Sequence, residues 1–386
     1  MNYTLDGTSK LQYAYPSNPK TSYLTWETIA TWNIGLDMSF LNSRLNFTGD
    51  YFIRDTEGML AKSYVLPSVF GAKEPKENCA DLRTKGWELS LNWNDSFALM
   101  GKRFNYTVSA SLGDNKTVIT KYNNPEKLLT DYYEGMVLGE IWGYRVDGLF
   151  TSDEEATEYT SKINQDFVNA RILSDKVDPY YRAGDLKFRD LDNNNVINKG
   201  DDTVYDPGDR EIIGNETPRY NYSFRLGADW NGFDLGIFFQ GVGKRDWYPN
   251  HLSTGFWGPY SRAFTSFIPE NFMDQCWSEE NPGGYFPRFR GYQTFKDSQL
   301  GVNNDRYLQN ASYIRLKNLT VGYTLPVLKK VFTKLRVYFT GENLWYWSPM
   351  KKYTKYIDPE AAGGNGNTGM AYNYSRNFSV GVDITF

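Results

Sequence analysis

The stretch YNYSFRLGADWNGFDLGIFF, residues 220–239, decides the fold. On each side of Asn231-Gly232 apolar and polar residues alternate strictly, which is the pattern of a strand whose two faces meet different environments. An Asn-Gly pair between two alternating runs is a strong hairpin signal, because a type I′ turn needs a positive φ at both central residues. The stretch therefore predicts two antiparallel strands joined by a two-residue turn.

The same alternation recurs along the whole chain, at 31–40, 45–53, 87–94, 104–112, 314–325, 335–339 and 378–386. With the hairpin, this predicts about ten strands, several of them close to the ~9–11 residues that a tilted transmembrane strand needs. In the run 314–325 the apolar face changes sides between Leu316 and Leu319. Such a change predicts a β-bulge at this point.

The composition favours a membrane barrel over a soluble β-protein. Aromatic residues make up 17% of the chain, with Tyr 30, Phe 24 and Trp 11, yet the mean hydropathy is polar at -0.59. A barrel wall alternates lipid-facing with lumen-facing residues and carries aromatic girdles at both interfaces. No run reaches the ~18 apolar residues of a membrane-spanning helix, and a closed barrel is the other way to satisfy backbone hydrogen bonds in lipid. We therefore expect an all-β transmembrane antiparallel barrel.

The expected connections between strands are unequal in length. Short ones fall at 41–43, 231–232 and 326–333, and long polar ones at 56–84, 114–140, 151–216, 242–310 and 344–376. Short turns on one side and long extracellular loops on the other are typical of outer-membrane barrels. In the third long loop, Ser152 followed by three acidic residues predicts the start of a short helix.

The chain stops at FSVGVDITF, residues 378–386, where alternation continues to a terminal aromatic residue. An ordinary last strand of any β-protein can end in this way. The pattern also resembles the C-terminal signal by which outer-membrane barrels are recognised for insertion. Together with the aromatic-rich strands before it, this ending favours the membrane interpretation.

Few residues suggest catalysis. The net charge is -4, which does not indicate a nucleic-acid partner. The single histidine, His251, excludes His-rich metal sites and most Ser-His or Cys-His catalysis, and we expect it in a surface loop. Cys79 and Cys276 lie in polar, loop-like sequence and could pair in an oxidising compartment, but two cysteines are no disulfide framework. We expect no enzyme activity and no organic cofactor.

Residues 190–202, DLDNNNVINKGDD, are spaced like a Ca²⁺-binding loop. The positions that would supply oxygen ligands are Asp190, Asp192, Asn194, the Val196 carbonyl, Asn198 (or a water) and Asp201. Asn195 replaces the usual glycine, although asparagine tolerates the left-handed conformation, and Asp201 replaces the usual glutamate. The alternative is an Asp/Asn-rich turn without metal. Asp185, Asp206 and Asp209 lie nearby and could join either version.

Aromatic residues gather in the long loops, and the candidates for ligand contact are Trp247, Tyr248, Trp257 and Tyr260. Aromatic faces stack on sugar rings, so a path for a glycan is one interpretation. The alternative is that these residues pack loop against loop, and that Trp345 to Trp347 belong to an interfacial girdle.

Nine segments, in order along the chain, resemble the SusC/RagA-type TonB-dependent transporters. They are WE (26–27), WNIGLD (32–37), YFIRDT (51–56), LRTKGWE (82–88), GDLKFRDLD (184–192), DREIIGN (209–215), PRY (218–220), YIRLKN (313–318) and TGENL (340–344). The resemblance implies that residues 1–386 form the C-terminal part of a barrel of about 22 strands with a plugged lumen, and contain no plug domain.

The resemblance also implies an active importer in the outer membrane of a Gram-negative bacterium. Its substrates would be oligosaccharides, or alternatively peptides, and its partners a SusD-like surface lipoprotein, TonB, outer-membrane lipid, and the N-terminal barrel half with the plug. A surface glycan-binding β-protein without transport is a further alternative. Because residues 1–4 do not begin a signal peptide, we expect a fragment or one part of a split protein.

Overall fold

The computed structural model describes residues 21, 23–62, 75–266, 268, 270–295, 297–326, 333–363 and 372–386. The expectation about residues 1–4 falls outside this part. The chain forms two compact units. The first comprises Met1–Trp32, Phe52–Lys85 and Lys116–Val137, and the second comprises Asn33–Tyr51, Gly86–Asn115 and Leu138–Phe386.

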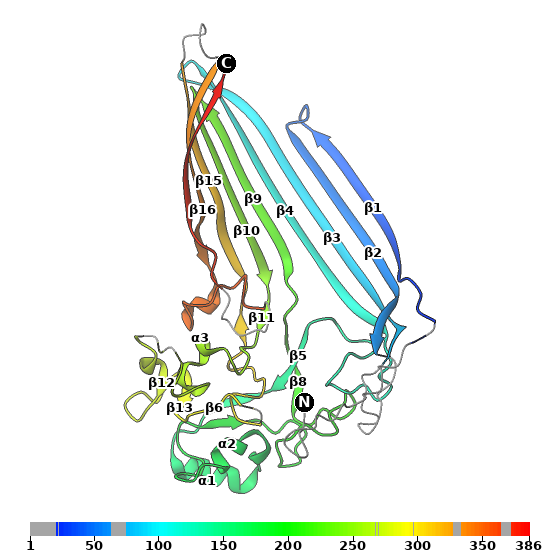
Figure 1. Ribbon diagram of the computed structural model, residues 1–386, viewed down its shortest axis with the longest axis vertical. Helices are drawn as coiled ribbons and strands as arrows, with labels where there is room; N and C mark the ends of the chain where they lie inside the picture. The colour runs from blue at the N-terminus through cyan, green and yellow to red at the C-terminus, as the bar shows by residue number, and fades with distance from the viewer. Residues whose placement is uncertain are drawn as a thin grey trace, which may run out of the picture. The chain divides into compact units, whose positions relative to one another are not determined.

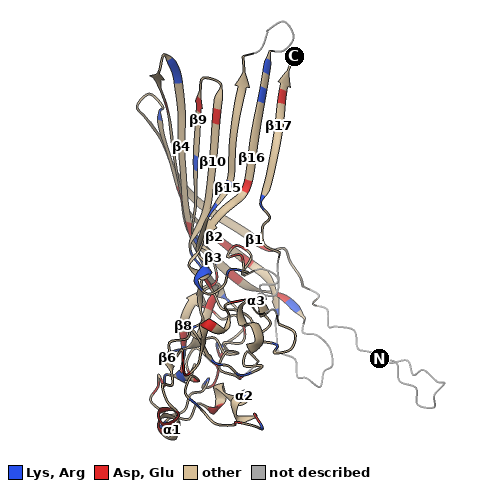
Figure 2. Cartoon of the chain, turned by 90° about the vertical axis from the view of Figure 1, so that its left-hand side faces the viewer, with Lys and Arg blue, Asp and Glu red and all other residues tan. Residues whose placement is uncertain are grey.

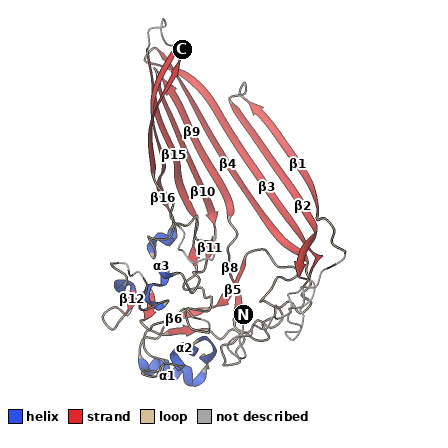
Figure 3. Cartoon of the chain, viewed as in Figure 1, coloured by secondary structure: helices blue, strands red, loops and turns tan. Residues whose placement is uncertain are grey.

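A nine-stranded sheet dominates the described part, with the order β1-β2-β3-β4-β9-β10-β15-β16-β17 (Figures 1 and 3). The pairs from β4 to β17 are antiparallel. Its strands are β1 (Thr28–Phe40), β2 (Leu45–Lys62), β3 (Lys76–Leu99), β4 (Lys102–Lys121), β9 (Arg219–Trp230), β10 (Phe233–Lys244), β15 (Tyr313–Leu325), β16 (Lys334–Trp347) and β17 (Asn377–Thr385). Strands that follow one another along the chain are neighbours, which is the connectivity expected of an up-and-down barrel wall.

The predicted hairpin is confirmed in β9 and β10. Trp230 pairs with Phe233, and the two residues between them, Asn231 and Gly232, have φ values of 51° and 89°. Gly232 is also required by close packing, because a Cβ there would lie 2.8 Å from the carbonyl oxygen of Thr324. The turn therefore has the backbone that the Asn-Gly pair predicts.

The predicted bulge is confirmed in β15. Phe238 of β10 pairs with Asn318, but the next residue, Phe239, pairs with Leu316. The pairing of β15 with β16 skips at the same place. Lys317 is thus the extra residue, and it changes the face on which the apolar residues of β15 lie.

The two faces of the sheet differ in chemistry. Four register partners on neighbouring strands form one apolar row, and each is between 38% and 76% exposed: Leu235, Val321, Phe339 and Val380. Alternate positions carry side-chain hydrogen bonds across strands, namely Asn105–Asp229 (2.7 Å), Thr107–Asn94 (2.8 Å), Ser111–Ser223 (2.7 Å) and Thr320–Thr340 (3.1 Å). Exposed apolar rows beside hydrogen-bonded polar rows are the pattern of a wall between lipid and lumen.

Several charged residues of the wall lie toward the end of the strands that carries the β9–β10 turn, as Figure 2 shows for acidic positions on β9 and β10 and basic positions on β16. Arg336 of β16 donates to Asp234 of β10 (Nε–Oδ1 2.8 Å) and to Asp383 of β17 (Nη1–Oδ2 3.0 Å). One guanidinium thereby connects strands on both sides of β16. At the opposite end of the strands, Trp345 and Trp347 are 49% and 55% exposed, as a membrane-interface girdle would be.

Three strands are longer than their alternation predicts. β2 continues to Lys62, β3 begins at Lys76 and β4 continues to Lys121, so the connections expected at 56–84 and 114–140 are shorter than predicted. In the first unit these ends are joined by polar contacts, such as Arg83 Nε to Asp55 Oδ1 at 2.6 Å and Thr84 to Thr117 at 2.8 Å. In these end segments polar residues lie on both faces of the strand, so apolar and polar residues do not alternate and the sequence gives no strand signal. The connection expected at 326–333 lies mostly outside the described residues.

The long loops of the second unit fold into a body of short elements (Figure 3). The strands are β5 (Glu140–Tyr144), β6 (Val146–Leu149), β7 (Leu186–Phe188), β8 (Arg210–Asn215), β11 (Asp246–Trp247), β12 (Cys276–Trp277), β13 (Phe286–Arg288) and β14 (Gln309–Asn310). The helices are α1 (Asp153–Lys162), α2 (Ala170–Leu173) and α3 (Thr254–Trp257), with the 3₁₀ turns η2 (Asp166–Val168), η3 (Gly258–Tyr260), η4 (Met273–Gln275) and η5 (Pro349–Lys352). Among the described residues, no helix has the length and apolar character needed to cross a membrane.

Smaller expectations can be checked in these loops. His251 is exposed, as predicted. Cys79 and Cys276 are free thiols, and each sulfur donates to a backbone carbonyl, of Lys62 and Phe272 respectively.

The helix predicted to start at Ser152 is confirmed as α1. The Ser152 hydroxyl accepts a hydrogen bond from the Glu155 backbone N–H, and the Glu155 carboxylate accepts from the Thr151 backbone N–H at 2.7 Å. The Lys187 ammonium contacts the same carboxylate at 2.8 Å, and this contact, with the Thr151 bonds, lowers the pKa of Glu155 to about 2. Glu155 thus joins the start of α1 to β7.

We predict that Leu226→Arg, in the middle of β9, destabilises the protein by about 2–4 kcal/mol, because it places a charge on the lipid-facing side of the wall. The control is Thr107→Arg. Thr107 pairs with Gly227, so it lies at nearly the same depth in the membrane as Leu226, but its side chain is on the polar face of the sheet. Urea unfolding of the complete protein in phospholipid vesicles measures both variants. An equal loss in both would contradict the assignment of the faces.

We predict that Glu155→Gln lowers the free energy of unfolding of the α1 segment by about 1 kcal/mol at neutral pH. The lowered pKa means that Glu155 stabilises the fold above its unfolded pKa and loses this effect as the pH falls through the folded value. The difference between variant and wild type should therefore shrink between about pH 5 and about pH 2. Hydrogen exchange of the α1 amides measures it, and a difference that is independent of pH would refute the prediction.

Candidate functional site

The most specific candidate site is the loop that leaves β7 and returns to β8. β7 pairs with β6, and its last residue, Phe188, is fully buried. β8 pairs with β5. Two small antiparallel ladders thus hold both ends of residues 189–209, so the loop between them is anchored on an ordered base.

Three carboxylates converge in this loop. One oxygen each of Asp190, Asp192 and Asp209 lie within 4.8 Å of one another. Asp209 is fully buried, and its two oxygens accept hydrogen bonds from the backbone N–H groups of Leu191 and Asn198, both at 2.8 Å. Asp209 therefore ties together the two arms of the loop while presenting its charge to the other carboxylates.

The turn between these arms is built by Asp190 and by left-handed asparagines. The Asp190 carboxylate accepts from the backbone N–H groups of Asn193 and Asn195, both at 2.8 Å. Asn193 and Asn195 have φ values of 62° and 64°. Asparagine at the position usually taken by glycine thus adopts the conformation that the loop needs.

The other predicted ligands are arranged differently. Asn194 Oδ1 accepts from the Val196 N–H at 2.7 Å, and Asn198 Nδ2 donates to the Val196 carbonyl at 2.8 Å. Asp201 is not a member of the carboxylate group in the described part of the chain, and its backbone N–H donates to Asp206 instead. Asp209 takes the place expected of Asp201, and the sequence indicated it only as a nearby extra acid.

The electrostatics of the group follow from its crowding. Burial raises the pKa of Asp209 above its usual value, and the negative charges of Asp192 and Asp190 add to the rise. The backbone N–H groups of Asn198 and Leu191 oppose it. A cation among three carboxylates would relieve this repulsion, and an all-oxygen donor set suits a hard cation such as Ca²⁺.

The four aromatic candidates lie in the core of the loop body. Trp247, Tyr248, Trp257 and Tyr260 are each at most 8% exposed. The Trp257 ring lies 5.4 Å from that of Tyr307, and the Tyr260 ring stacks on that of Phe286 at 5.8 Å. The polar side-chain atoms of Tyr248, Trp257 and Tyr260 bond to backbone carbonyls, as Tyr260 Oη does to Pro287 at 2.6 Å. Their burial supports the packing alternative, and ligand contact by these rings stays a prediction.

Two buried ion pairs in the loops were not predicted from the sequence. Arg290 donates to Asp185 (Nη2–Oδ2 3.0 Å) and to the carbonyls of Asp178 and Tyr180, so Asp185 serves an ion pair and not the carboxylate group. Arg315, 1% exposed at the start of β15, contacts the equally buried Asp358. The partners are 105 and 43 residues apart, so no local pattern links them.

Comparisons with known proteins agree with this architecture. A family model described as TonB dependent receptor-like, beta-barrel matches residues 2–344. TonB-dependent receptor P26 of Formosa agariphila is 27% identical over all of this chain and 37% of its own length. TonB-dependent receptor SusC of Bacteroides thetaiotaomicron is 24% identical over 97% of this chain and 34% of its own length.

Solved structures of a relative share the fold. The structure of the RagAB peptide transporter aligns with a TM-score of 0.66 and 21% identity, covering all of this chain and 38% of that chain. The RagAB peptide importer in its open-open state aligns with a TM-score of 0.67 and 22% identity. The present chain thus spans a little over a third of the length of the relatives that it matches.

The alternating wall, its antiparallel order and the family match over most of the chain lead to one assignment. They confirm the expected resemblance and place the protein in the outer membrane of a Gram-negative bacterium. The chain belongs to the TonB-dependent receptor-like β-barrel family.

Proposed function

We propose that the complete protein imports oligosaccharides across the outer membrane as a TonB-dependent transporter of the SusC/RagA type. The observation that carries the proposal is the wall itself, with an exposed apolar row on one face and a polar, hydrogen-bonded row on the other, in a chain of this family. Such a wall separates lipid from an aqueous lumen, which an importer needs and a soluble binding protein does not.

We further propose that other strands and a plug complete the transporter. β1 and β17 are the two ends of the nine-stranded sheet. An end strand in lipid has unpaired backbone groups, each of which costs several kcal/mol by order of magnitude. The remaining barrel strands, from the same protein or a companion chain, would pair with both edges, and TonB would act on the plug.

A surface lipoprotein of the SusD type is the proposed partner at the loops. The support is the likeness to SusC and to RagAB. The RagAB structures are described as open-open and closed-closed states of a peptide importer. The loop body has an ordered aromatic core, including Trp257 and Tyr307, on which a partner could dock without the loops first having to fold. A preorganised surface reduces the entropic cost of association.

Oligosaccharides are the proposed substrates because aromatic rings remain exposed on the loop body. Tyr180, Phe289 and Phe295 are between 40% and 63% exposed. The second candidate is a peptide, favoured by the fold shared with the RagAB peptide transporter. The third candidate is a surface glycan-binding protein without transport. It would use the same exposed aromatic rings but would not need a closed barrel.

We also propose that the loop 189–209 binds Ca²⁺ through Asp190, Asp192 and Asp209. Their convergence within 4.8 Å and the burial of Asp209 support a cation there. Asn194, the Val196 carbonyl and Asn198 would be neighbours of the ion within the same loop. The cation would neutralise the carboxylates and stabilise the link between β7 and β8.

The calcium proposal predicts that Asp190→Asn with Asp192→Asn abolishes bound Ca²⁺ and exposes residues 189–209 to protease. Asp201→Asn is the matched control, because it removes an exposed carboxylate of the same loop outside the group. Metal analysis and limited proteolysis with and without chelator measure the effects. Loss of metal in the control, or its retention in the double variant, would contradict the assignment of ligands.

Import is tested by deleting the protein in its own bacterium and measuring growth on a panel of purified oligosaccharides and, separately, on peptides. We expect growth to be lost on at least one oligosaccharide and restored by the complete gene. Loss only on peptides would favour the second candidate. Recovery of the purified protein in solution without detergent would contradict an outer-membrane importer altogether.

A further inference from the structure

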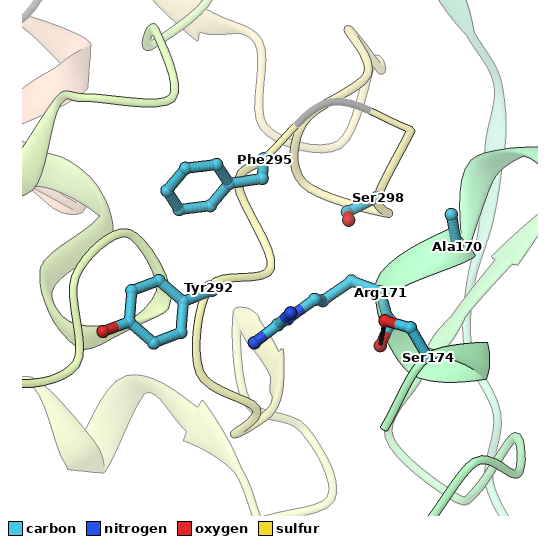
Figure 4. A pocket seen from close by; sticks show the side chains of 6 residues that line it. All are labelled: Ala170, Arg171, Ser174, Tyr292, Phe295 and Ser298. Atoms are coloured by element: carbon cyan, nitrogen blue, oxygen red, sulfur yellow. Dashed lines mark hydrogen bonds between the residues drawn. The ribbon is translucent and has the colours of Figure 1, made fainter. Parts of the chain in front are cut away.

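A pocket of about 520 Å³ opens in the loop body between the region of α2 and the residues Tyr292, Phe295 and Ser298. Figure 4 shows its lining residues, which are Ala170, Arg171, Ser174, Tyr292, Phe295 and Ser298. None of them was singled out by the sequence, and the carboxylate group of the loop 189–209 has no residue in common with them. The lining combines one cation, two aromatic rings (one of them the Tyr292 phenol) and two serine hydroxyls, and these six residues include no acidic side chain.

Arg171 supplies the charge of the pocket. Its guanidinium carbon lies 5.4 Å from the centre of the Tyr292 ring, and it makes no ion pair with any residue that the structure describes. The nearest acid along the chain, Asp175, accepts hydrogen bonds from the backbone N–H groups of Val177 and Asp178. Arg171 interacts electrostatically with Asp175 but forms no ion pair among the described residues, so a guanidinium held against a ring in this way is suited to pair with an anionic group of a ligand.

The two serines supply hydrogen-bonding groups. Ser174 Oγ donates to the Arg171 carbonyl at 3.1 Å, which leaves its oxygen able to accept a bond. Ser298 is 1% exposed, and its hydroxyl has no hydrogen-bond partner among the described residues. A buried hydroxyl without a partner is costly in a folded protein, so its presence at a pocket wall points to a ligand or water that completes its bonding.

The aromatic rings form an apolar wall beside these groups. The rings of Tyr292 and Phe295 lie 5.7 Å apart, and Phe295 is 40% exposed. Tyr292 and Asp297 have φ values of 63° and 59°, and the Ala170 N–H donates to the Asp297 carbonyl at 2.8 Å. Tyr292 and Asp297 are thus held in unfavourable backbone conformations, and Asp297 is bonded to α2, as residues of binding sites often are.

We infer that this pocket binds an acidic sugar unit, a uronate, of the imported oligosaccharide. Arg171 pairs with the carboxylate, Tyr292 and Phe295 cover the apolar C–H face of the ring, and the serine hydroxyls bond to sugar hydroxyls. This inference rests on the proposed import of oligosaccharides and narrows its substrate to acidic glycans. A hydrophobic pocket without a cation would have no preference for the charged form.

The test is calorimetric titration of the complete protein in detergent with trigalacturonate, with maltotriose as the neutral comparison and the tripeptide Gly-Gly-Phe as a carboxylate of another class. We expect wild type to bind trigalacturonate in preference to both. Arg171→Gln should weaken this binding about tenfold or more, and Ser298→Ala should weaken it less without lowering thermal stability. Arg262→Gln, which changes an exposed arginine outside the pocket, should leave it unchanged.

No binding of trigalacturonate by wild type, equal binding by Arg171→Gln, or preference for Gly-Gly-Phe would each overturn the inference. A circular-dichroism spectrum and melting temperature like those of wild type show that the variants are folded. Uptake of neutral oligosaccharides by cells is measured in parallel, so that failure of the acidic-sugar inference can be told apart from failure of the import proposal. Import with no acidic-sugar site would overturn only the inference, whereas no import of any oligosaccharide would overturn the proposed function.

Discussion

The need to hydrogen-bond every backbone group in lipid is the constraint on which the rest of the structure depends. Water is absent from the hydrocarbon layer, so the backbone groups of the strands must bond to one another. The sheet accordingly runs as an unbroken series of nine hydrogen-bonded strands from β1 to β17, and its pairs from β4 to β17 are antiparallel. The same constraint explains the alternation of side chains. Apolar residues such as Leu235 and Val321 face outward, while polar partners such as Ser111 and Ser223 bond across strands on the other face.

The loop body obeys a different constraint, because it lies outside the wall and must hold itself together as a soluble domain does. Many of its aromatic residues are therefore buried in a core of their own, with Trp257 and Tyr260 fully covered. Its charges are paired across long stretches of sequence, as Arg290 and Asp185 are. Among the described residues, the carboxylates around Asp209 and the Ser298 hydroxyl at the pocket around Arg171 are polar groups without a complete set of protein partners. Both proposed ligands follow from that incompleteness.

Much of the fold could be predicted, because its signals are local. The Asn231-Gly232 turn, the bulge at Lys317 and the Ser152 cap were each indicated by a few adjacent residues and were each confirmed. The ends of β2 to β4 were predicted too short, since beyond the wall both faces of a strand are polar and alternation disappears. The site was predicted in part. Asp190 and Asp192 are two residues apart and belong to one motif, but Asp209 joins them only because β8 returns the chain to the loop.

The sequence by itself determined the period of two, the turns and the composition of the wall, because each of these depends on neighbours along the chain and on the solvent that each face meets. Tertiary structure alone decided which carboxylate completes the group with Asp190, and that Trp257 and Tyr260 pack inward. It also placed Arg171 opposite Tyr292 and Ser298 across more than a hundred residues of chain. Contacts of that kind depend on how the loops close on one another, and no periodicity in the sequence records them.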